Sequence, residues 1–230
     1  MSLYGQTADM DIINAIGAKH NITVIEDAAQ SFGARYKGKR SCNLSTLATT
    51  SFFPAKPLGC YGDGGAIFTN NTELADKIRV IKNHGQSKRY HHSVIGVNSR
   101  LDTLQAAILN IKLKYYDKEI LRRQEIAAKY TQLLGDKVHT PIVLEGRSSV
   151  WAQYTVRVEN RDKVQAYLKE AGVPTAVHYP KPLHLQEAFA YLGSKVGDFP
   201  ISEKVSKEVM SLPMSAFVTE AEIQLICDIV

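Results

Sequence analysis

The sequence predicts an α/β fold in residues 1–135, with a mixed, mostly parallel sheet and helices, and a smaller α+β domain in residues 136–230. Two observations support this division. In the first half, short apolar runs alternate with segments of helical period. A turn-rich stretch over 135–149 then separates that half from a second one, in which a half-buried strand is followed by helices.

The first half begins with a helix and a buried strand. Met10, Ile13 and Ile16 recur at helical spacing, and the run 22–25 is apolar and short, as in a buried strand. The polar residues Glu26, Asp27 and Gln30 follow directly, and the carboxyl ends of strands are where open α/β sheets place ligands.

Turn residues and periodicity predict the remaining elements in order. In the first half they are a hairpin turning at Gly38, strands over 49–53 and 66–69, a helix capped by Thr72 and stopping at Gly85, a loop over 86–99, and a long helix over 101–134. In the second half they are a strand over 150–158, a helix from Asn160 to Gly172, a strand over 175–178, and two closing helices, the last opened by the capping box Thr219-x-x-Glu222.

The composition is that of a globular protein in a reducing compartment. Of the 230 residues, 44% are hydrophobic and 22% charged, and no apolar run approaches the ~18 residues of a membrane span. The first residues have no signal-peptide pattern. The three cysteines, Cys42, Cys60 and Cys227, lack CxxC spacing, so we expect neither disulfides nor zinc, and a cytoplasmic location.

The net charge of +5 leaves a nucleic-acid-binding or regulatory protein as an alternative. The basic residues are scattered, however, and form no stripe interleaved with aromatic residues. A solvated basic face, or a mild attraction for phosphorylated substrates, explains the charge more simply. We therefore expect neither nucleic acid nor a membrane as a partner.

Lys56 stands apart from the other lysines. It lies between Pro54 and Pro57, directly after an aromatic strand, so its segment is stiff and partly desolvated. A lysine that forms an imine needs such a setting, because its amine must be able to lose its charge. Taken alone, a lysine in such a loop is more often structural.

Asp27 strengthens the interpretation of Lys56. Pyridoxal phosphate acts as an electron sink when its ring nitrogen stays protonated, and a carboxylate beside that nitrogen is the usual device. Asp27 alone could equally be a helix cap, or a metal ligand paired with Glu26.

Ser51 is a natural donor to a phosphate, or else a strand-edge serine bonded to backbone. The glycine-rich loop 62–65 lets the backbone approach the lysine loop closely.

Three blocks of sequence resemble the DegT-type sugar aminotransferases, which have the type I fold of pyridoxal-phosphate-dependent transferases. The blocks are VIEDAAQSFGA at 24–34, SFFPAKPLGCYGDGGA at 51–66 and GVNSRLDTLQAAI at 96–108. They stand in the order and spacing of the family, and the resemblance extends more weakly to Val230. It implies a type I large domain followed by a small C-terminal domain.

The resemblance implies roles for five residues around the cofactor, pyridoxal 5'-phosphate. Lys56 would carry the cofactor, and Asp27 would partner its ring nitrogen. Gln30 would bond its phenolic oxygen and Ser51 its phosphate. Asn98 would reach the phosphate in the neighbouring subunit, because the family builds shared sites in a homodimer.

Three further residues are implied on the substrate side. Arg100 matches the third block and would anchor substrate. His178 and Tyr179 stand where the small domain of the family lines the sugar site, although packing of a strand end explains them equally well. Ala55 and Pro57 depart from residues common in close relatives and leave the sugar open.

The implied reaction transfers an amino group, usually from L-glutamate, to a keto sugar linked to a nucleotide. The second block is most similar to members acting on UDP-2-acetamido-3-keto-hexoses or their uronates, for surface polysaccharide or glycan biosynthesis. Enzymes acting on 4-keto-6-deoxy sugars are the runner-up. Sugar 3-dehydratases of the same fold replace the lysine with histidine, so Lys56 argues against them.

Members of the family have roughly a hundred or more residues before the point that matches Met1, a size typical of a complete two-domain chain. That segment holds the helix N-terminus that binds the cofactor phosphate and the aromatic ring that stacks on the cofactor. We therefore expect the chain to be an N-terminally truncated and inactive fragment of the enzyme.

Overall fold

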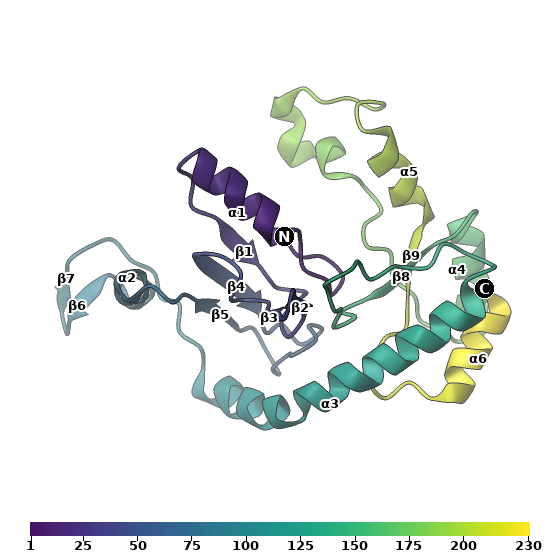
Figure 1. Cartoon of the computed structure of the whole chain (residues 1–230), viewed down its shortest axis with the longest axis horizontal. Coiled ribbons are helices and arrows are strands. Elements are labelled where there is room, and N and C mark those ends of the chain that lie inside the picture. The colour runs from purple at the N-terminus through teal and green to yellow at the C-terminus, as the bar shows by residue number, and fades with distance from the viewer. The chain divides into compact units, whose positions relative to one another are not determined.

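The computed structural model describes residues 1–230, which form two compact units. One unit contains residues 1–120 and 143–152, and the other contains residues 121–142 and 153–230. The long helix α3 (Thr103–Leu134) contributes residues to both units (Figure 1). The division into folding domains at residues 135 and 136 stays a prediction. None of the helices is both long and apolar enough to cross a membrane.

The first unit is built on a mixed sheet of strand order β1-β4-β5. Helix α1 (Met10–Lys19) precedes β1 (Ile25–Asp27), which is parallel to β4 (Leu47–Ser51); β5 (Gly65–Phe68) is antiparallel to β4. The predicted α/β class is therefore confirmed. Strand β1 starts three residues later than predicted, because its pairing with β4 begins at Ile25 and includes the acidic residues that follow.

The predicted hairpin is present, as β2 (Arg35–Tyr36) and β3 (Lys39–Arg40). Two other predictions were wrong. Helix α2 (Thr72–Lys82) is capped by Asn71 rather than Thr72, because the Asn71 side chain accepts from the backbone N–H of Leu74 at 3.0 Å. The segment 86–99 is not only loop, since its polar residues pair as the hairpin of β6 (Gln86–Lys88) and β7 (His91–His92).

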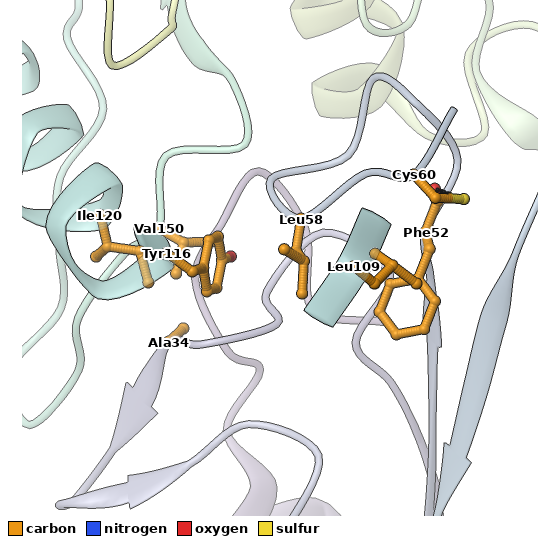
Figure 2. Packing of buried hydrophobic residues seen from close by; sticks show 8 residues of the cluster. All are labelled: Ala34, Phe52, Leu58, Cys60, Leu109, Tyr116, Ile120 and Val150. Atoms are coloured by element: carbon orange, nitrogen blue, oxygen red, sulfur yellow. Dashed lines mark hydrogen bonds between the residues drawn. The ribbon is translucent and has the colours of Figure 1, made fainter. Parts of the chain in front are cut away.

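The larger of the two apolar clusters in this unit joins α3 to the segment that follows β4. Figure 2 shows its side chains, which come from sequence positions far apart. Leu109 and Tyr116 of α3 contribute to the cluster, and so do Leu58 and Cys60 of the loop that carries Lys56. Residues 57–60, the returning half of the lysine loop, are thus part of the core.

In the second unit a two-stranded antiparallel sheet packs with helices. Its elements are β8 (Tyr154–Arg157), α4 (Arg161–Glu170), the 3₁₀ helices η1 (Leu183–Leu185) and η2 (Glu187–Leu192), α5 (Pro200–Glu208), β9 (Val209–Leu212) and α6 (Glu220–Ile229). Leu168, Met210 and Ile223 are fully buried, one each from α4, β9 and α6. The predicted capping box of α6 is confirmed.

Three local predictions differ here. Residues 175–178 form no strand, since only Ala176 pairs with Ser211 in an isolated bridge. The strand β9 was missed because all four of its residues are buried, so its short sequence shows no alternation. Asn160 precedes α4 as predicted, but it is in the left-handed conformation and its side chain makes no capping bond.

Candidate functional site

Asp27 and Ser51 lie on one face of the sheet, near the carboxyl ends of two parallel strands. Asp27 pairs with Thr49 in the register of β1 and β4, and Ser51 lies two residues further on. Because side chains alternate along a strand, these three side chains share a face. All three are half-buried, whereas the residues between them, such as Thr50, are buried on the opposite face.

Glu26 lies on the buried face and has partners of its own. Its carboxylate accepts from the Ser41 hydroxyl at 2.8 Å and from the Cys42 backbone N–H at 3.0 Å. Burial and the nearby Glu26 carboxylate raise the pKa of Cys42 to about 12. Glu26 and Asp27 therefore point to opposite faces, and no group of three His, Cys, Asp or Glu side chains in the chain is arranged to hold a metal ion.

The loop carrying Lys56 leaves β4 and returns against the same strand. The Phe52 N–H donates to Gly64 O, and the Cys60 N–H donates to Phe52 O, both at 2.8 Å. Within the loop, the Lys56 N–H donates to Phe53 O at 2.8 Å. These bonds fix the loop at both ends, and the side chain of Lys56 is half-buried.

Two glycines permit this tight path. A Cβ on Gly59 would lie 2.5 Å from Pro54 O and 2.7 Å from Phe53 O, and a Cβ on Gly65 would lie 2.8 Å from Thr50 O. Such distances are too short for any side chain, so the expected close approach of backbone is present. It occurs at Gly59 as well as at the glycine-rich end of the loop.

The polar atoms around the strand ends are only partly used by the protein. One oxygen of Asp27, Oδ1, accepts from the Ala29 N–H at 3.1 Å. The Ser51 hydroxyl accepts from the Phe53 N–H at 3.2 Å, which leaves its own hydrogen for another acceptor. Gln30 is buried, and its side-chain oxygen accepts from the Tyr4 N–H at 2.7 Å. That contact gives Gln30 a role within the fold besides the predicted one.

Asn98 and Arg100 line a hollow that Thr49 of β4 also lines. Both are exposed, and the hollow has a volume of about 1080 Å³ and is bounded by β5 and α2. Arg100 Nη1 contacts His84 Nε2 at 3.2 Å and Asn83 Oδ1 at 3.4 Å. Because neither Lys56 nor Asp27 lines the hollow, the hollow by itself does not define the site.

His178 and Tyr179 belong to the second unit. His178 Nδ1 and the Ser211 hydroxyl are 2.8 Å apart, and burial lowers the pKa of His178. The two rings meet edge to face with centroids 5.5 Å apart. His178 is therefore held by Ser211 of β9. This is a packing role, one of the two alternatives that the sequence left open; the other is contact with substrate.

Two residues of this region were missed by the sequence analysis. Thr49 shares the half-buried face with Asp27 and Ser51, and the strict alternation along β4 could have identified it. His84 contacts Arg100 from sixteen residues away in the sequence. No sequence pattern signals that pairing, since it depends on how the hairpin 86–92 folds back.

The fold and these strand ends define a class of protein. It is an α/β protein in which Asp27 ends one strand and the parallel strand next to it leads into the loop that carries Lys56. The chain belongs to the DegT/DnrJ/EryC1/StrS aminotransferase family, whose pattern matches residues 1–230.

Two similar proteins agree with the assignment to this family. The chain is 61% identical over 228 residues to a UDP-2-acetamido-2-deoxy-3-oxo-D-glucuronate aminotransferase of Pseudomonas aeruginosa, covering 99% of the chain and 63% of that protein. It is 52% identical to a pleiotropic regulatory protein of Geobacillus stearothermophilus, covering 98% of the chain and 62% of that protein.

A solved structure is also similar. The crystal structure of DesV from S. venezuelae, in complex with a ketimine intermediate, has a TM-score of 0.95 and 39% identity, covering 99% of the chain and 62% of DesV. The chain thus spans a little over three fifths of the length of these relatives.

Proposed function

We propose that the protein containing this chain is a pyridoxal-phosphate-dependent aminotransferase. It transfers an amino group from an amino acid, L-glutamate, to the keto carbon of a UDP-linked 2-acetamido-3-keto-hexose or its uronate. One observation carries the proposal. Asp27 and Ser51 lie at the ends of the parallel strands β1 and β4, and Lys56 lies on the loop that directly follows β4. The likeness to the P. aeruginosa enzyme supports the choice of sugar.

The residues present fit the cofactor. Asp27 Oδ2 has no hydrogen-bond partner in the chain, so it is available to a cationic ring N–H. The Ser51 hydroxyl has a hydrogen to donate to a phosphate oxygen. Lys56 follows within five residues on a loop tied to the same strand. When bound, pyridoxal phosphate supplies an electron sink for bond changes at the carbon that carries the amino group.

The chain's own groups then divide the work. Lys56 Nζ would hold the cofactor and, as a free amine, would act as the base that accepts a proton from the α-carbon of the amino donor. Asp27 holds a proton at the ring nitrogen, because its carboxylate stabilises the positive charge there. Gln30 and Ser51 orient the ring through its phenolic oxygen and its phosphate.

The remaining predicted residues face the sugar and the partner subunit in this proposal. Arg100 binds a negative group of the nucleotide sugar, and Asn98 reaches the cofactor phosphate of the second subunit in a homodimer. His178 hydrogen-bonds to the sugar in this proposal, and burial lowers its pKa, which favours the neutral imidazole. We place the enzyme in the cytoplasm, in the synthesis of surface polysaccharide or glycan.

A chemical-labelling experiment tests the cofactor assignment on the chain itself. The chain is incubated with pyridoxal phosphate, reduced with borohydride and digested, and the modified lysine is identified by mass spectrometry. We expect the label at Lys56 in the wild type, none at that peptide in Lys56→Ala, and an unchanged pattern in Lys114→Ala, which alters an exposed lysine of α3. Label spread evenly over the surface lysines would contradict the proposal.

The substrate is tested by 2-oxoglutarate release from L-glutamate, with UDP-2-acetamido-3-keto-glucuronate and a 4-keto-6-deoxy nucleotide sugar as rival acceptors. The assay is run on the 230-residue chain and on the product of the complete reading frame, since the relatives are longer. We expect the 3-keto uronate to be preferred. A preference for the 4-keto sugar would overturn the choice of substrate and leave the cofactor assignment in place.

A further inference from the structure

One face of α3 carries two polar side chains that hold the loop bearing Lys56. Gln105 and Lys112 stand seven residues apart, two helical turns, so they project from the same side of the helix. Leu109 and Tyr116 continue that side, and both are buried in the core with Leu58 and Cys60 of the loop (Figure 2). The apolar contacts therefore fix the distance between this helix face and the loop.

The two polar side chains contact the part of the loop that returns to the sheet. Gln105 Oε1 accepts from the Tyr61 N–H at 2.8 Å, and a Cβ on Gly62 would lie 3.1 Å from Gln105 Nε2. Lys112 Nζ donates to Gly59 O at 2.5 Å and lies 5.9 Å from the centroid of the Tyr61 ring. Backbone groups at both ends of the segment 59–61 are thus bonded to the helix.

The same segment is bonded from its other side to the residues that directly follow β4. The Cys60 thiol donates to Phe52 O at 3.0 Å, in addition to the bond from its backbone N–H, and Gly59 rests on the carbonyls of Phe53 and Pro54. In the sequence, Lys56 lies between Phe52 and the segment 59–61 that these bonds join. Without the polar bonds from α3, the returning half of the loop would be held by its bonds to Phe52 and by the apolar contacts of Leu58 and Cys60.

We propose that Gln105 and Lys112 are positioning residues, which clamp the segment 59–61 and thereby keep Lys56 at the strand end where it meets the cofactor. This inference rests on the proposed function. A charged donor on a half-buried carbonyl is a stronger tie than a neutral one, so Lys112 is the principal member of the pair.

Hydrogen exchange of the cofactor-free chain tests the clamp directly. We expect Lys112→Met, which keeps the apolar stem, and Gln105→Ala to speed exchange of the amides of 56–62 by about tenfold, while the amides of β4 and β5 change little. The matched controls are Lys114→Met and Asn110→Ala, both exposed on the same helix. Exchange of 56–62 within about twofold of wild type in both variants would overturn the inference.

A second readout separates positioning from plain stability. Labelling with pyridoxal phosphate and borohydride gives the fraction of label at Lys56 relative to the surface lysines. We expect that fraction to fall about threefold or more in Lys112→Met and to recover in Lys112→Arg, which retains a cationic donor. A Lys112→Met chain with fast exchange but an undiminished label at Lys56 would also overturn the inference. If the wild type itself shows no preference for Lys56, the proposed function fails, and the exchange data still decide whether the clamp exists.

Discussion

Asp27 is paired with Thr49 across the parallel strands β1 and β4, and the next residue, Ala28, donates its N–H to Thr49 O at 2.8 Å. The backbone of the acidic residue is therefore held on the strand that leads into the lysine loop. Thr50 adds a bond in the other direction, from its hydroxyl to Ala28 O at 3.2 Å. The relative position of the carboxylate and Ser51 follows from this ladder and needs no side-chain contact between them.

Asp27→Asn tests whether this carboxylate has an electronic role. We expect the variant to retain some cofactor and to slow the glutamate half-reaction by more than about tenfold, or ~1.4 kcal/mol of barrier, because a neutral amide stabilises a ring cation poorly. Stopped-flow absorbance of the complete gene product measures the rate, and Asp63→Asn, which alters an acid of the glycine-rich loop, is the control. A half-reaction within about threefold of wild type would exclude Asp27 as the partner of the ring nitrogen.

Mixed dimers test the role proposed for Asn98. Lys56→Ala subunits and Asn98→Ala subunits are each expected to give weakly active homodimers. If each site takes Lys56 from one subunit and Asn98 from the other, a mixed dimer has one doubly altered site and one intact site. Its activity should approach about half that of the wild-type dimer. Mixed dimers shown to have formed, yet no more active than either parent, would place Asn98 outside the neighbour's site.

The sequence predicted the α/β class of this region better than its local geometry. Asp27, Ser51 and Lys56 were singled out because of the apolar run 22–25 and the aromatic strand beside them, and their roles stay predictions. The run 22–25 was expected to be buried, but Ile22 and Ile25 are exposed in the structure. The hairpin of β6 and β7 was missed because its strands are polar and short, so no period marks them. The clamp by Gln105 and Lys112 was missed for a different reason. It joins residues that are 44 and 53 positions apart, and that contact exists only once α3 packs on the loop.

Glu26 provides a prediction about thiol reactivity. Burial first, and then the Glu26 carboxylate, raise the pKa of Cys42 to about 12, so the reactive thiolate is scarce at neutral pH. Glu26→Gln removes the negative charge and keeps an acceptor for the Ser41 hydroxyl. We expect the pKa of Cys42 to fall and its alkylation at about pH 9 to speed up severalfold. The rate at Cys42 is followed by peptide mass spectrometry, with the buried Cys227 as the internal reference. An unchanged alkylation rate would show that burial alone suppresses the thiol.

Glu203 provides a prediction about acid stability in the second unit. Its carboxylate accepts from the Gly197 N–H at 2.8 Å and lies 3.1 Å from His184 Nε2, and these contacts, the backbone bond first, hold its pKa below the ordinary value of 4.5. A carboxyl whose pKa is lower in the folded state stabilises that state above its unfolded pKa, and the stabilisation is lost as the pH falls through the folded pKa. Native-state hydrogen exchange of the amides of 197–203 should therefore show more frequent opening at about pH 3 than at about pH 5.

Glu203→Gln should open more often than wild type at about pH 5. It should lose less local stability on acidification, because the amide does not titrate. Glu170→Gln, at an exposed site on α4, should behave as wild type. If Glu203→Gln kept the full acid dependence of the wild type in this segment, another carboxyl group would have to be responsible for it.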